Sequence, residues 1–368
     1  MKVPFVDLKA QFENLRPSIF KNIHAVLEKC NFILGEEVLQ FESQFAKYCG
    51  VNYAVGVASG LDALSLSLRA LNISVGDEVI VPANTFIATA LAVSLTGAKP
   101  VFVDVNENNF LMDFNAVKKV ITLKTKAIIP VHLYGRMMDL SPLLSMAKEK
   151  NIYLIEDAAQ AHGATLHNNK AGSVGVLGCF SFYPGKNLGC YGDGGLITTN
   201  DKNLYEKLLA LRNYGSMKKY YHNTLGYNSR LDTLQAAVLN AKLPYLDEYN
   251  QLRYEKAIFY NQSLSGIGDL VLPEIPEPGS HAFHLYVVRT KKINGLLQAL
   301  QAAEISTVIH YPIPIHLQDA YVSLGYKKGD FPISEMLSCE ILSLPLYPEL
   351  TEQQMKYVVT QIKNFYKT

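Results

Sequence analysis

The sequence predicts an α/β protein with a mainly parallel, seven-stranded sheet that is covered by helices on both faces. Seven short apolar and β-branched segments lie between residues 52 and 199, and helical patterns separate the first five of them. Each segment is apolar almost throughout, which is typical of strands buried on both faces. Strands that alternate with helices are joined by crossover connections and form a parallel sheet.

The expected elements follow the chain in a regular order. Strands are predicted at 52–59, 77–84, 99–105, 126–135, 152–159, 177–182 and 194–199. Apolar residues at helical spacing predict helices at about 15–28, within 32–50, and at 61–71, 85–97, 114–121 and 141–150. Ser59 and Gly60 open the third of these helices, and Gly97 ends the fourth.

Near residue 230 the sequence pattern changes from alternating strands and helices to a long helical pattern. Residues 229–264 form one long amphipathic helical pattern, which Pro244 is expected to bend or break. A strand at 282–290 and helices at 295–303 and 351–366 follow, and they indicate a smaller α+β unit. We therefore expect a large domain at 1–243 and a small C-terminal domain at 244–368.

The composition is that of an ordinary globular protein, with 368 residues, 49% hydrophobic and 18% charged, and a net charge of +1. This charge indicates neither a nucleic acid nor a membrane surface as a partner. The five cysteines form no CxxC pair, so we expect no metal site and no disulfide framework. We also expect no signal peptide and no membrane span, because no apolar run approaches about 20 residues. These features favour a cytoplasmic enzyme.

One lysine is notable for its setting. Lys186 lies between Pro184-Gly185 and Asn187, on a glycine-rich loop that joins the strands expected at 177–182 and 194–199. A lysine held on a tight turn between buried strands is partly desolvated, which lowers the pKa of its amine. A neutral amine can attack a carbonyl group and form a Schiff base. On this segment alone, a solvated loop lysine is the alternative.

Two further segments follow strand ends, where an open α/β sheet binds its ligands. Ser59-Gly60-Leu61 opens a helix, and the free backbone N–H groups there can hold a phosphate, with a plain serine N-cap as the alternative. Phe86, next to Thr85, can stack on a flat ligand or can pack in the core.

The remaining candidates for ligand contacts are an acidic segment at a strand end and a hydroxyl on the next strand. Asp157 ends an apolar strand, where a carboxylate is costly to bury unless it has a cationic partner such as a protonated pyridine nitrogen. Helix capping by Asp157 is the alternative. Gln160 and His162 lie close enough in sequence to reach other edges of the same ring, and Ser181 can offer its hydroxyl to a phosphate. A phosphate cradle, a stacking aromatic, an acid and a Schiff-base lysine together describe pyridoxal 5'-phosphate.

The chain resembles the sugar aminotransferases of the DegT/DnrJ/EryC1/StrS family over essentially its whole length. The most specific segments are PANTFIATALAV, EDAAQAHGA, FSFYPGKNLGCYGDGG, GYNSRLDTLQAAVL and HYPIPIHLQ. The family belongs to the aspartate-aminotransferase-like superfamily, so the resemblance implies fold type I with a large cofactor domain and a smaller C-terminal domain. It also implies pyridoxal 5'-phosphate as cofactor, present as pyridoxamine 5'-phosphate during part of the cycle.

The resemblance assigns roles to individual residues. Lys186 and Asp157 are the catalytic residues, one bound covalently to the cofactor and the other paired with its pyridine nitrogen. Further cofactor contacts are implied for Ser59, Gly60, Leu61, Phe86, Gln160, Ser181 and Asn228. Asn228 resembles the residue that the family sends across a homodimer interface to the partner's phosphate. Leu61 stands where the family commonly has a hydroxyl residue, which leaves only its backbone N–H for the phosphate. A dehydrating lineage has histidine in place of the lysine that this chain keeps.

The reaction implied is transamination from L-glutamate, which leaves as 2-oxoglutarate, to a nucleotide-linked keto sugar. NSRLD, FYPGKNLG and HYPIPIHLQ are similar to members acting at carbon 3 of dTDP-linked 6-deoxy-hexoses, so a dTDP-3-amino-3,6-dideoxy-hexose is the expected product. Such a deoxyamino sugar suits a lipopolysaccharide O-antigen or an S-layer glycan. The residues expected around the sugar nucleotide are Tyr183, Tyr214, Lys219, Tyr221, His310, Tyr311 and His316.

Several alternatives remain open from the sequence. His310 and His316 could be loop histidines with structural partners, and residues 214–221 could form a solvated loop. Arg230 is only a candidate for binding the carboxylate of the donor. A 4-aminotransferase acting on a UDP- or dTDP-4-keto sugar is a rival enzyme. A non-catalytic regulator that binds pyridoxal phosphate is a rival of another class, although the intact Lys186–Asp157 pair argues against it.

Overall fold

A seven-stranded sheet forms the centre of this computed structural model, which describes residues 1–367. The strand order is β1-β9-β8-β5-β4-β2-β3, and every pairing is parallel except the two made by β9. The predicted seven-stranded, mainly parallel sheet is therefore confirmed. The strands are β1 (Tyr53–Val57), β2 (Glu78–Pro82), β3 (Lys99–Val103), β4 (Thr125–Ile128), β5 (Tyr153–Asp157), β8 (Leu177–Ser181) and β9 (Gly195–Thr199).

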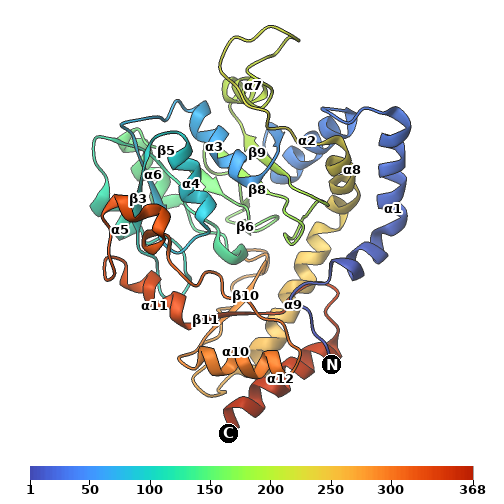
Figure 1. Ribbon diagram of the computed structural model, residues 1–368, viewed down its shortest axis with the longest axis vertical. Coiled ribbons are helices and arrows are strands. Elements are labelled where there is room, and N and C mark those ends of the chain that lie inside the picture. Colours follow the sequence, from blue (N-terminus) through green and yellow to red (C-terminus); the bar gives the residue numbers. More distant parts are fainter. Residues whose placement is uncertain (368) are drawn as a thin grey trace.

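Helices cover both faces of the sheet (Figure 1). Because successive side chains of a strand point to opposite faces, Cys179 and Phe180 of β8 belong to two different apolar cores. The core on the Cys179 face contains residues of α3 (Gly60–Ala70), α4 (Ile87–Leu95) and α7 (Lys202–Leu211). The cores on the other face contain residues of α2 (Glu36–Cys49), α5 (Phe114–Val120), α6 (Ser141–Lys150) and α8 (Thr233–Lys242).

The long helical pattern bends where it was predicted to bend. It divides into α8, a short 3-10 turn η2 (Leu243–Tyr245) that contains Pro244, and α9 (Leu246–Leu264). The first helix of the chain, α1 (Leu8–Lys29), packs against α8 and begins earlier than the residue predicted. The side chain of Asp7 caps α1 by accepting a hydrogen bond from the N–H of Ala10 at 2.9 Å.

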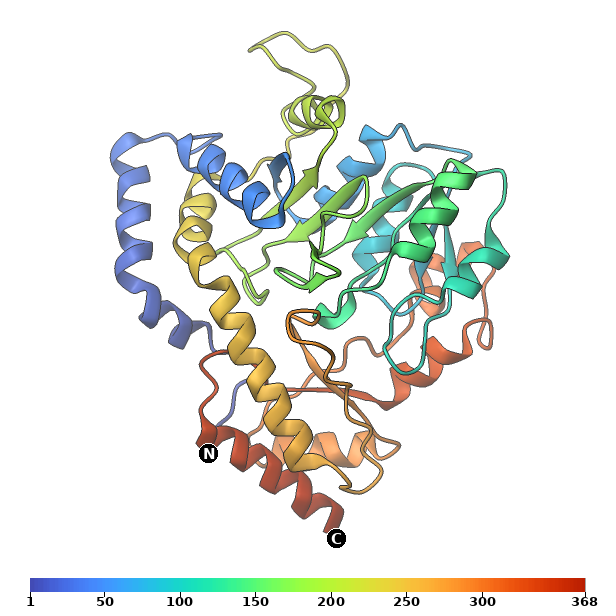
Figure 2. The same ribbon diagram turned by 180° about the vertical axis from the view of Figure 1, so that it is seen from behind.

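The C-terminal part has a second sheet and a core of its own. β10 (Tyr286–Arg289) pairs with β11 (Ile341–Leu344) in antiparallel register. The core around it includes Tyr260 of α9 and Val358 of α12 (Glu352–Lys367). The division at residue 243 stays a prediction, although these elements lie together below the large sheet (Figure 2). The remaining elements are β6 (Thr165–Leu166), β7 (Asn169–Lys170), α10 (Ile293–Ala302), α11 (Pro332–Glu340), η1 (Leu133–Gly135), η3 (Ile315–Leu317) and η4 (Asp319–Leu324).

The loop between α7 and α8 projects away from the rest of the chain at the top of Figure 1 and Figure 2. It exposes large apolar side chains, including Leu225, which is 90% exposed. Among the helices of residues 1–367, none combines the length and apolar character that crossing a bilayer requires.

Candidate active site

A cavity of about 650 Å³ lies beyond the carboxyl ends of β1, β2, β5 and β8, where an open α/β sheet binds its ligands. Part of its wall comes from the segments singled out in the sequence: Ser59, Gly60, Leu61, Thr85, Phe86, Asp157, Gln160, Ser181, Tyr183 and Lys186. The rest of the wall includes Phe5 and Val6 at the start of the sequence and, from later in the chain, Arg253, His284, His310, Tyr311, Leu344 and Leu346. The cavity therefore lies between the large sheet and the C-terminal elements.

Lys186 is held in this cavity by a tightly tied loop. Its backbone N–H donates to the carbonyl of Tyr183 at 2.9 Å, and the neighbouring Asn187 donates through Nδ2 to the carbonyl of Ala282 at 2.8 Å. A side chain at Gly189 would place its Cβ 2.4 Å from the carbonyl oxygen of Pro184, so this turn requires glycine. Burial lowers the pKa of Lys186 to about 8, partly opposed by the Asp157 carboxylate. The amine is thus partly neutral near neutral pH and can act as a nucleophile.

Asp157 ends β5 and is only 5% exposed. Its Oδ2 accepts a hydrogen bond from Thr89 Oγ1 at 2.8 Å, and its Oδ1 accepts one from the N–H of Ala159 at 3.2 Å. Burial raises the pKa of this carboxyl, and those hydrogen bonds and Lys186 oppose the rise. No basic side chain in residues 1–367 forms an ion pair with it. A buried carboxylate that faces a cavity without an ion-pair partner fits a protonated pyridine nitrogen.

Gln160 has its amide oriented by two neighbours. Its Oε1 accepts a hydrogen bond from the N–H of Tyr134 at 2.6 Å, and its Nε2 donates to Tyr311 Oη at 3.2 Å. The hydroxyl of Tyr134 in turn donates to the carbonyl of His310. Through these contacts the β5 end of the site is linked to the 310–311 segment that forms the opposite wall.

The start of α3 is suited to hold a phosphate at the cavity wall. The first N–H groups of a helix have no partner within the helix, so those of Gly60 and Leu61 are suited to an anion. Ser59 caps the helix, its Oγ accepting from the N–H of Asp62 at 3.1 Å. A Cβ on Gly60 would lie 2.6 Å from the Cβ of Ser181, so glycine allows α3 and β8 to approach this closely.

The residues present therefore fit pyridoxal phosphate. They supply a partly neutral lysine, a buried carboxylate, an oriented amide and a cradle of N–H and hydroxyl groups. Phe86, 51% exposed, lies at the edge of the cavity with its ring 5.4 Å from that of Tyr311. When bound, the cofactor would supply an electron sink next to the Lys186 amine.

The residues expected around the sugar divide into two groups. Tyr183, His310 and Tyr311 line the cavity. Burial lowers the pKa of His310 to about 4, so its imidazole is neutral at pH 7, with Nδ1 2.9 Å from Ser343 Oγ. His316 is not brought to the cavity: it is 1% exposed, and its Nε2 lies 3.0 Å from Glu335 Oε1.

The remaining expected residues lie on or beside the projecting loop, away from the cavity of their own chain. These residues are Tyr214, Lys219, Tyr221, Asn228 and the donor candidate Arg230. Arg230 donates to Asn213 Oδ1 at 3.1 Å and lies over the ring of Tyr214. His162 also lies outside the cavity lining; it is buried beside Phe180 and Phe182.

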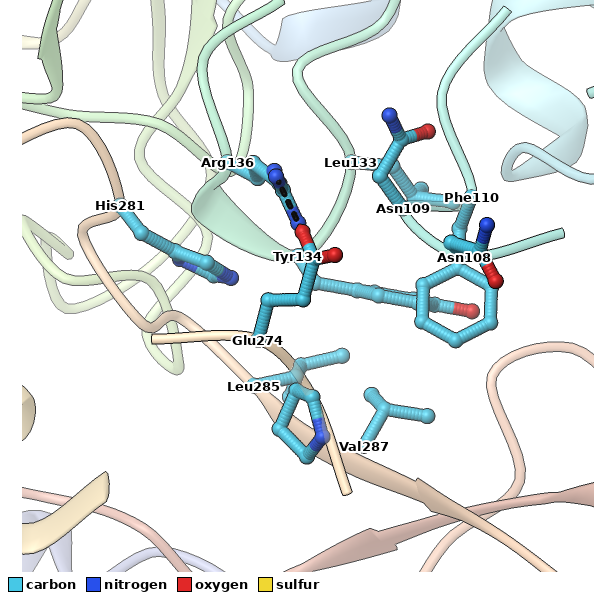
Figure 3. Close-up of a pocket in the computed structure, with 11 residues that line it drawn as sticks. Asn108, Asn109, Phe110, Leu133, Tyr134, Arg136, Glu274, His281, Leu285 and Val287 are labelled. Carbon is cyan, nitrogen blue, oxygen red and sulfur yellow. Dashed lines mark hydrogen bonds and ion pairs between the residues drawn. The ribbon is translucent and has the colours of Figure 1, made fainter. Parts of the chain in front are cut away.

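A second, much smaller crevice is lined by Tyr134 and the other residues drawn in Figure 3. Arg136 and Glu274 form an ion pair of 2.8 Å across it, and the ring of Tyr134 lies edge-on to that of Phe110. Its volume of about 10 Å³ admits roughly one water molecule, so it is not a ligand site. Within residues 1–367, no group of three or more His, Cys, Asp or Glu side chains could hold a metal ion.

Sequence reasoning missed Thr89, Tyr134, His284 and Arg253. Thr89 and Tyr134 act through contacts with distant segments that no local pattern indicates. Arg253 did leave a signal, because it occupies the buried stripe of α9 at helical spacing with Tyr249, Ala257 and Tyr260. An arginine within such a stripe indicates a buried cation.

Comparison with known proteins shows relatives of the same length. A protein from Aneurinibacillus thermoaerophilus named dTDP-3-amino-3,6-dideoxy-alpha-D-galactopyranose transaminase is 46% identical over 363 residues, which cover 99% of each chain. UDP-N-acetyl-3-dehydro-alpha-D-glucosamine 3-aminotransferase of Acidithiobacillus ferrooxidans is 45% identical over 98% of this chain and 97% of its own. A pleiotropic regulatory protein of Geobacillus stearothermophilus is 45% identical over 100% of this chain and 99% of its own.

Solved structures have the same fold. Streptomyces venezuelae DesV, crystallised with a ketimine intermediate, superposes with a TM-score of 0.97 at 45% identity, covering 100% of this chain and 99% of that one. The NtdA structure from Bacillus subtilis, with bound pyridoxamine phosphate, has a TM-score of 0.92 at 30% identity and covers 100% of this chain and 86% of that one. The model of the DegT/DnrJ/EryC1/StrS aminotransferase family matches residues 13–363. The chain therefore belongs to the DegT/DnrJ/EryC1/StrS family of pyridoxal-phosphate-dependent aminotransferases.

Proposed function

We propose that this protein moves the amino group of L-glutamate to a nucleotide-linked 3-keto-6-deoxy-hexose and so makes a 3-amino-3,6-dideoxy-hexose nucleotide. The observation that supports this most is that Lys186, Asp157 and Gln160 all line one cavity of about 650 Å³. A cavity of this size has room for substrate as well as cofactor. Relatives named for amination at carbon 3 of dTDP- and UDP-sugars support that position on the ring.

Different residues of the protein have different roles in the proposed reaction. Lys186 would hold the cofactor, which would supply an electron sink, and the amine of Lys186 can take up and return a proton at the reacting carbon of the substrate. Asp157 would pair with the ring nitrogen of the cofactor and favour its protonated form. Neutral His310 and the hydroxyls of Tyr183 and Tyr311 lie on the wall left for the sugar, where they can exchange hydrogen bonds with its hydroxyl groups.

We propose further that two copies form a homodimer and that each completes the other's site. Large exposed side chains on the projecting loop support this, because contiguous apolar surface usually marks an interface. In such a dimer the loop of one subunit brings Tyr214, Lys219, Tyr221 and Asn228 to the cavity of its partner. The family resemblance of Asn228 supports the same arrangement.

Two other functions remain as rivals. One is amination at carbon 4 of a UDP- or dTDP-sugar by the same machinery. The other is a cofactor-binding regulator, which the name of the Geobacillus stearothermophilus relative suggests. The cavity and the Lys186–Asp157 pair favour catalysis, since a regulator that only holds the cofactor requires neither a carboxylate for the ring nitrogen nor space for a sugar nucleotide.

A panel of nucleotide sugars tests the proposal. The holoenzyme is incubated with L-glutamate and with 3-keto or 4-keto 6-deoxy-hexoses linked to dTDP or UDP, and products are identified by mass spectrometry and NMR. We expect amination of a dTDP-3-keto sugar. Amination of only 4-keto sugars would move the reaction to carbon 4, and binding without turnover on every sugar would support the regulator.

A further inference from the structure

The first residues of the chain are tied to the C-terminal part of the molecule. Val3 is fully buried and forms a parallel bridge with Ile305. Its N–H donates to the carbonyl of Glu304 at 3.0 Å, and its carbonyl accepts from the N–H of Ser306 at 2.9 Å. A chain terminus is usually poorly ordered unless it is tied down in this way. Residues 4–7 lead directly into α1, so they are held at both ends beside the C-terminal elements (Figure 1).

This segment brings two apolar side chains, Phe5 and Val6, to the cavity wall. The ring of Phe5 packs against the imidazole of His310, with the two ring centroids 5.6 Å apart and the ring planes inclined by 33°. Because burial lowers the pKa of His310 to about 4, the imidazole is neutral at pH 7. A neutral imidazole can lie against a phenyl ring without losing the hydration of a charge.

The imidazole of His310 is held from several sides. Its Nδ1 lies 2.9 Å from Ser343 Oγ, and Phe5 packs against its ring. The main chain around it is held as well, because Val308 exchanges backbone hydrogen bonds with Ser343 and the hydroxyl of Tyr134 donates to the carbonyl of His310. Its Nε2 has no hydrogen-bond partner within residues 1–367. This atom is therefore the one left to meet a ligand.

A role in apolar packing alone is the alternative for Phe5, which also lies against the core that contains Leu285 and Val287. Packing of that kind requires an apolar side chain but no imidazole beside it. Phe114 of α5 packs against the same core and is also half-buried, but it does not line the cavity. The two phenylalanines thus differ in the contact with His310, which makes Phe114 a matched control.

We propose that Phe5 is a positioning residue that holds the imidazole of His310 toward the sugar, so that the N-terminal segment takes part in sugar recognition. This inference rests on the proposed function, in which His310 meets the hydroxyl groups of the nucleotide sugar. A side chain that binds a ligand needs such support, because a site that is loose by about 1 Å loses much of its effect. Phe5 makes no contact with Lys186 or Asp157, so its replacement should spare the cofactor end of the site.

The experiment measures the sugar and the rest of the nucleotide separately on the cofactor-loaded enzyme. Calorimetry gives the Kd of a dTDP-linked 6-deoxy-hexose that has no keto group and therefore cannot react, and the Kd of dTDP alone. The absorbance of the cofactor follows the half-reaction with L-glutamate. The variants are Phe5→Leu, Phe5→Ala, His310→Gln and the double variant Phe5→Leu/His310→Gln, with Phe114→Leu as the control.

We expect Phe5→Leu to raise the Kd of the sugar nucleotide about three- to tenfold, because leucine fills the space but offers no flat face to the imidazole. The Kd of dTDP and the glutamate half-reaction should change by less than about twofold, and Phe114→Leu should alter none of the three. In the His310→Gln background, Phe5→Leu should add less than about twofold, because the imidazole that it positions is gone. Phe5→Ala should act more strongly in the same direction, and Phe5→Leu decides alone if the alanine variant does not fold.

Two sets of results would overturn the proposal. If Phe5→Leu weakened sugar binding equally with and without the imidazole, Phe5 would act independently of His310. An equal loss on dTDP alone, or an unchanged Kd for the sugar nucleotide, would leave Phe5 no part in reading the sugar. If the wild-type enzyme aminates no nucleotide keto sugar, the proposed function fails instead.

Discussion

The amine of Lys186 should combine with pyridoxal phosphate at a pH at which an ordinary lysine is almost inert. Only the neutral amine attacks the aldehyde, so the rate follows the neutral fraction. At about pH 7.5, a pKa of about 8 leaves roughly a quarter of the amine neutral, whereas an ordinary pKa of 10.5 leaves roughly one part in a thousand. The burial of Lys186 therefore predicts a reaction on the order of two hundredfold faster.

The measurement is the rate of reconstitution of cofactor-free protein between about pH 6 and pH 10. A free lysine derivative measured over the same range corrects for ionisation of the cofactor itself. We expect the corrected rate to rise with pH and to level off above about 8. In Asp157→Asn the midpoint should move to lower pH, because the carboxylate now raises the pKa of Lys186. A rate that keeps rising toward pH 10.5 would refute the desolvation argument, and borohydride reduction with peptide mapping must find the cofactor on Lys186.

Three further results are expected. Asp157→Ala should lower turnover by at least about a hundredfold in folded, cofactor-loaded protein, and near-normal kcat would contradict its role. The Lys186→Ala chain and the Asn228→Asp chain should each be inactive alone, but should regain activity when they are unfolded, mixed and refolded together. The reason is that one site of the mixed dimer carries neither change. Mixed dimers without activity would exclude a shared site. Glu156→Gln should destabilise the protein by about 1–3 kcal/mol in chemical denaturation, since its carboxylate accepts backbone N–H groups and a hydrogen bond from His132. Burial raises the pKa of Glu156, but the His132 contact and the N–H donors more than offset this, so its stabilisation is present above about pH 4.5 and is lost as the pH falls further.

The cofactor half of the site could be predicted because its determinants are local. Ser59, Phe86, Asp157 and Lys186 each lie at or after the end of an apolar strand, and strand ends of a parallel sheet meet at one edge. Asp157 at the end of β5 and Lys186 after β8 were therefore expected in one place before any distance was known. Even the bend at Pro244 follows from a local steric rule.

The substrate half depends on less local information. His310 and Tyr311 were expected there only from the family resemblance, and Arg253 was not expected at all. All three reach the cavity because the C-terminal elements pack against the large sheet, and sequence spacing does not encode that packing. His316 shows that a shared motif does not ensure a shared site. It lies in the same sequence motif as His310, but its side chain pairs with Glu335 and does not line the cavity. The early start of α1 was missed for a smaller reason, since apolar spacing does not mark a first turn that Asp7 caps.

In the function proposed above, the cofactor and the substrate are selected by different parts of the chain. Gln160 links these two parts by hydrogen bonds, because its side chain accepts from the N–H of Tyr134 and donates to the hydroxyl of Tyr311. A change at position 310 or 311 alters the wall left for the sugar while Lys186, Asp157 and the start of α3 stay in place. This arrangement would account for relatives at about 45% identity that bear names for dTDP- and UDP-linked sugars. Substrate range should therefore follow the C-terminal wall and, in the homodimer proposed above, the loop of the neighbouring subunit, rather than the glycine-rich lysine loop.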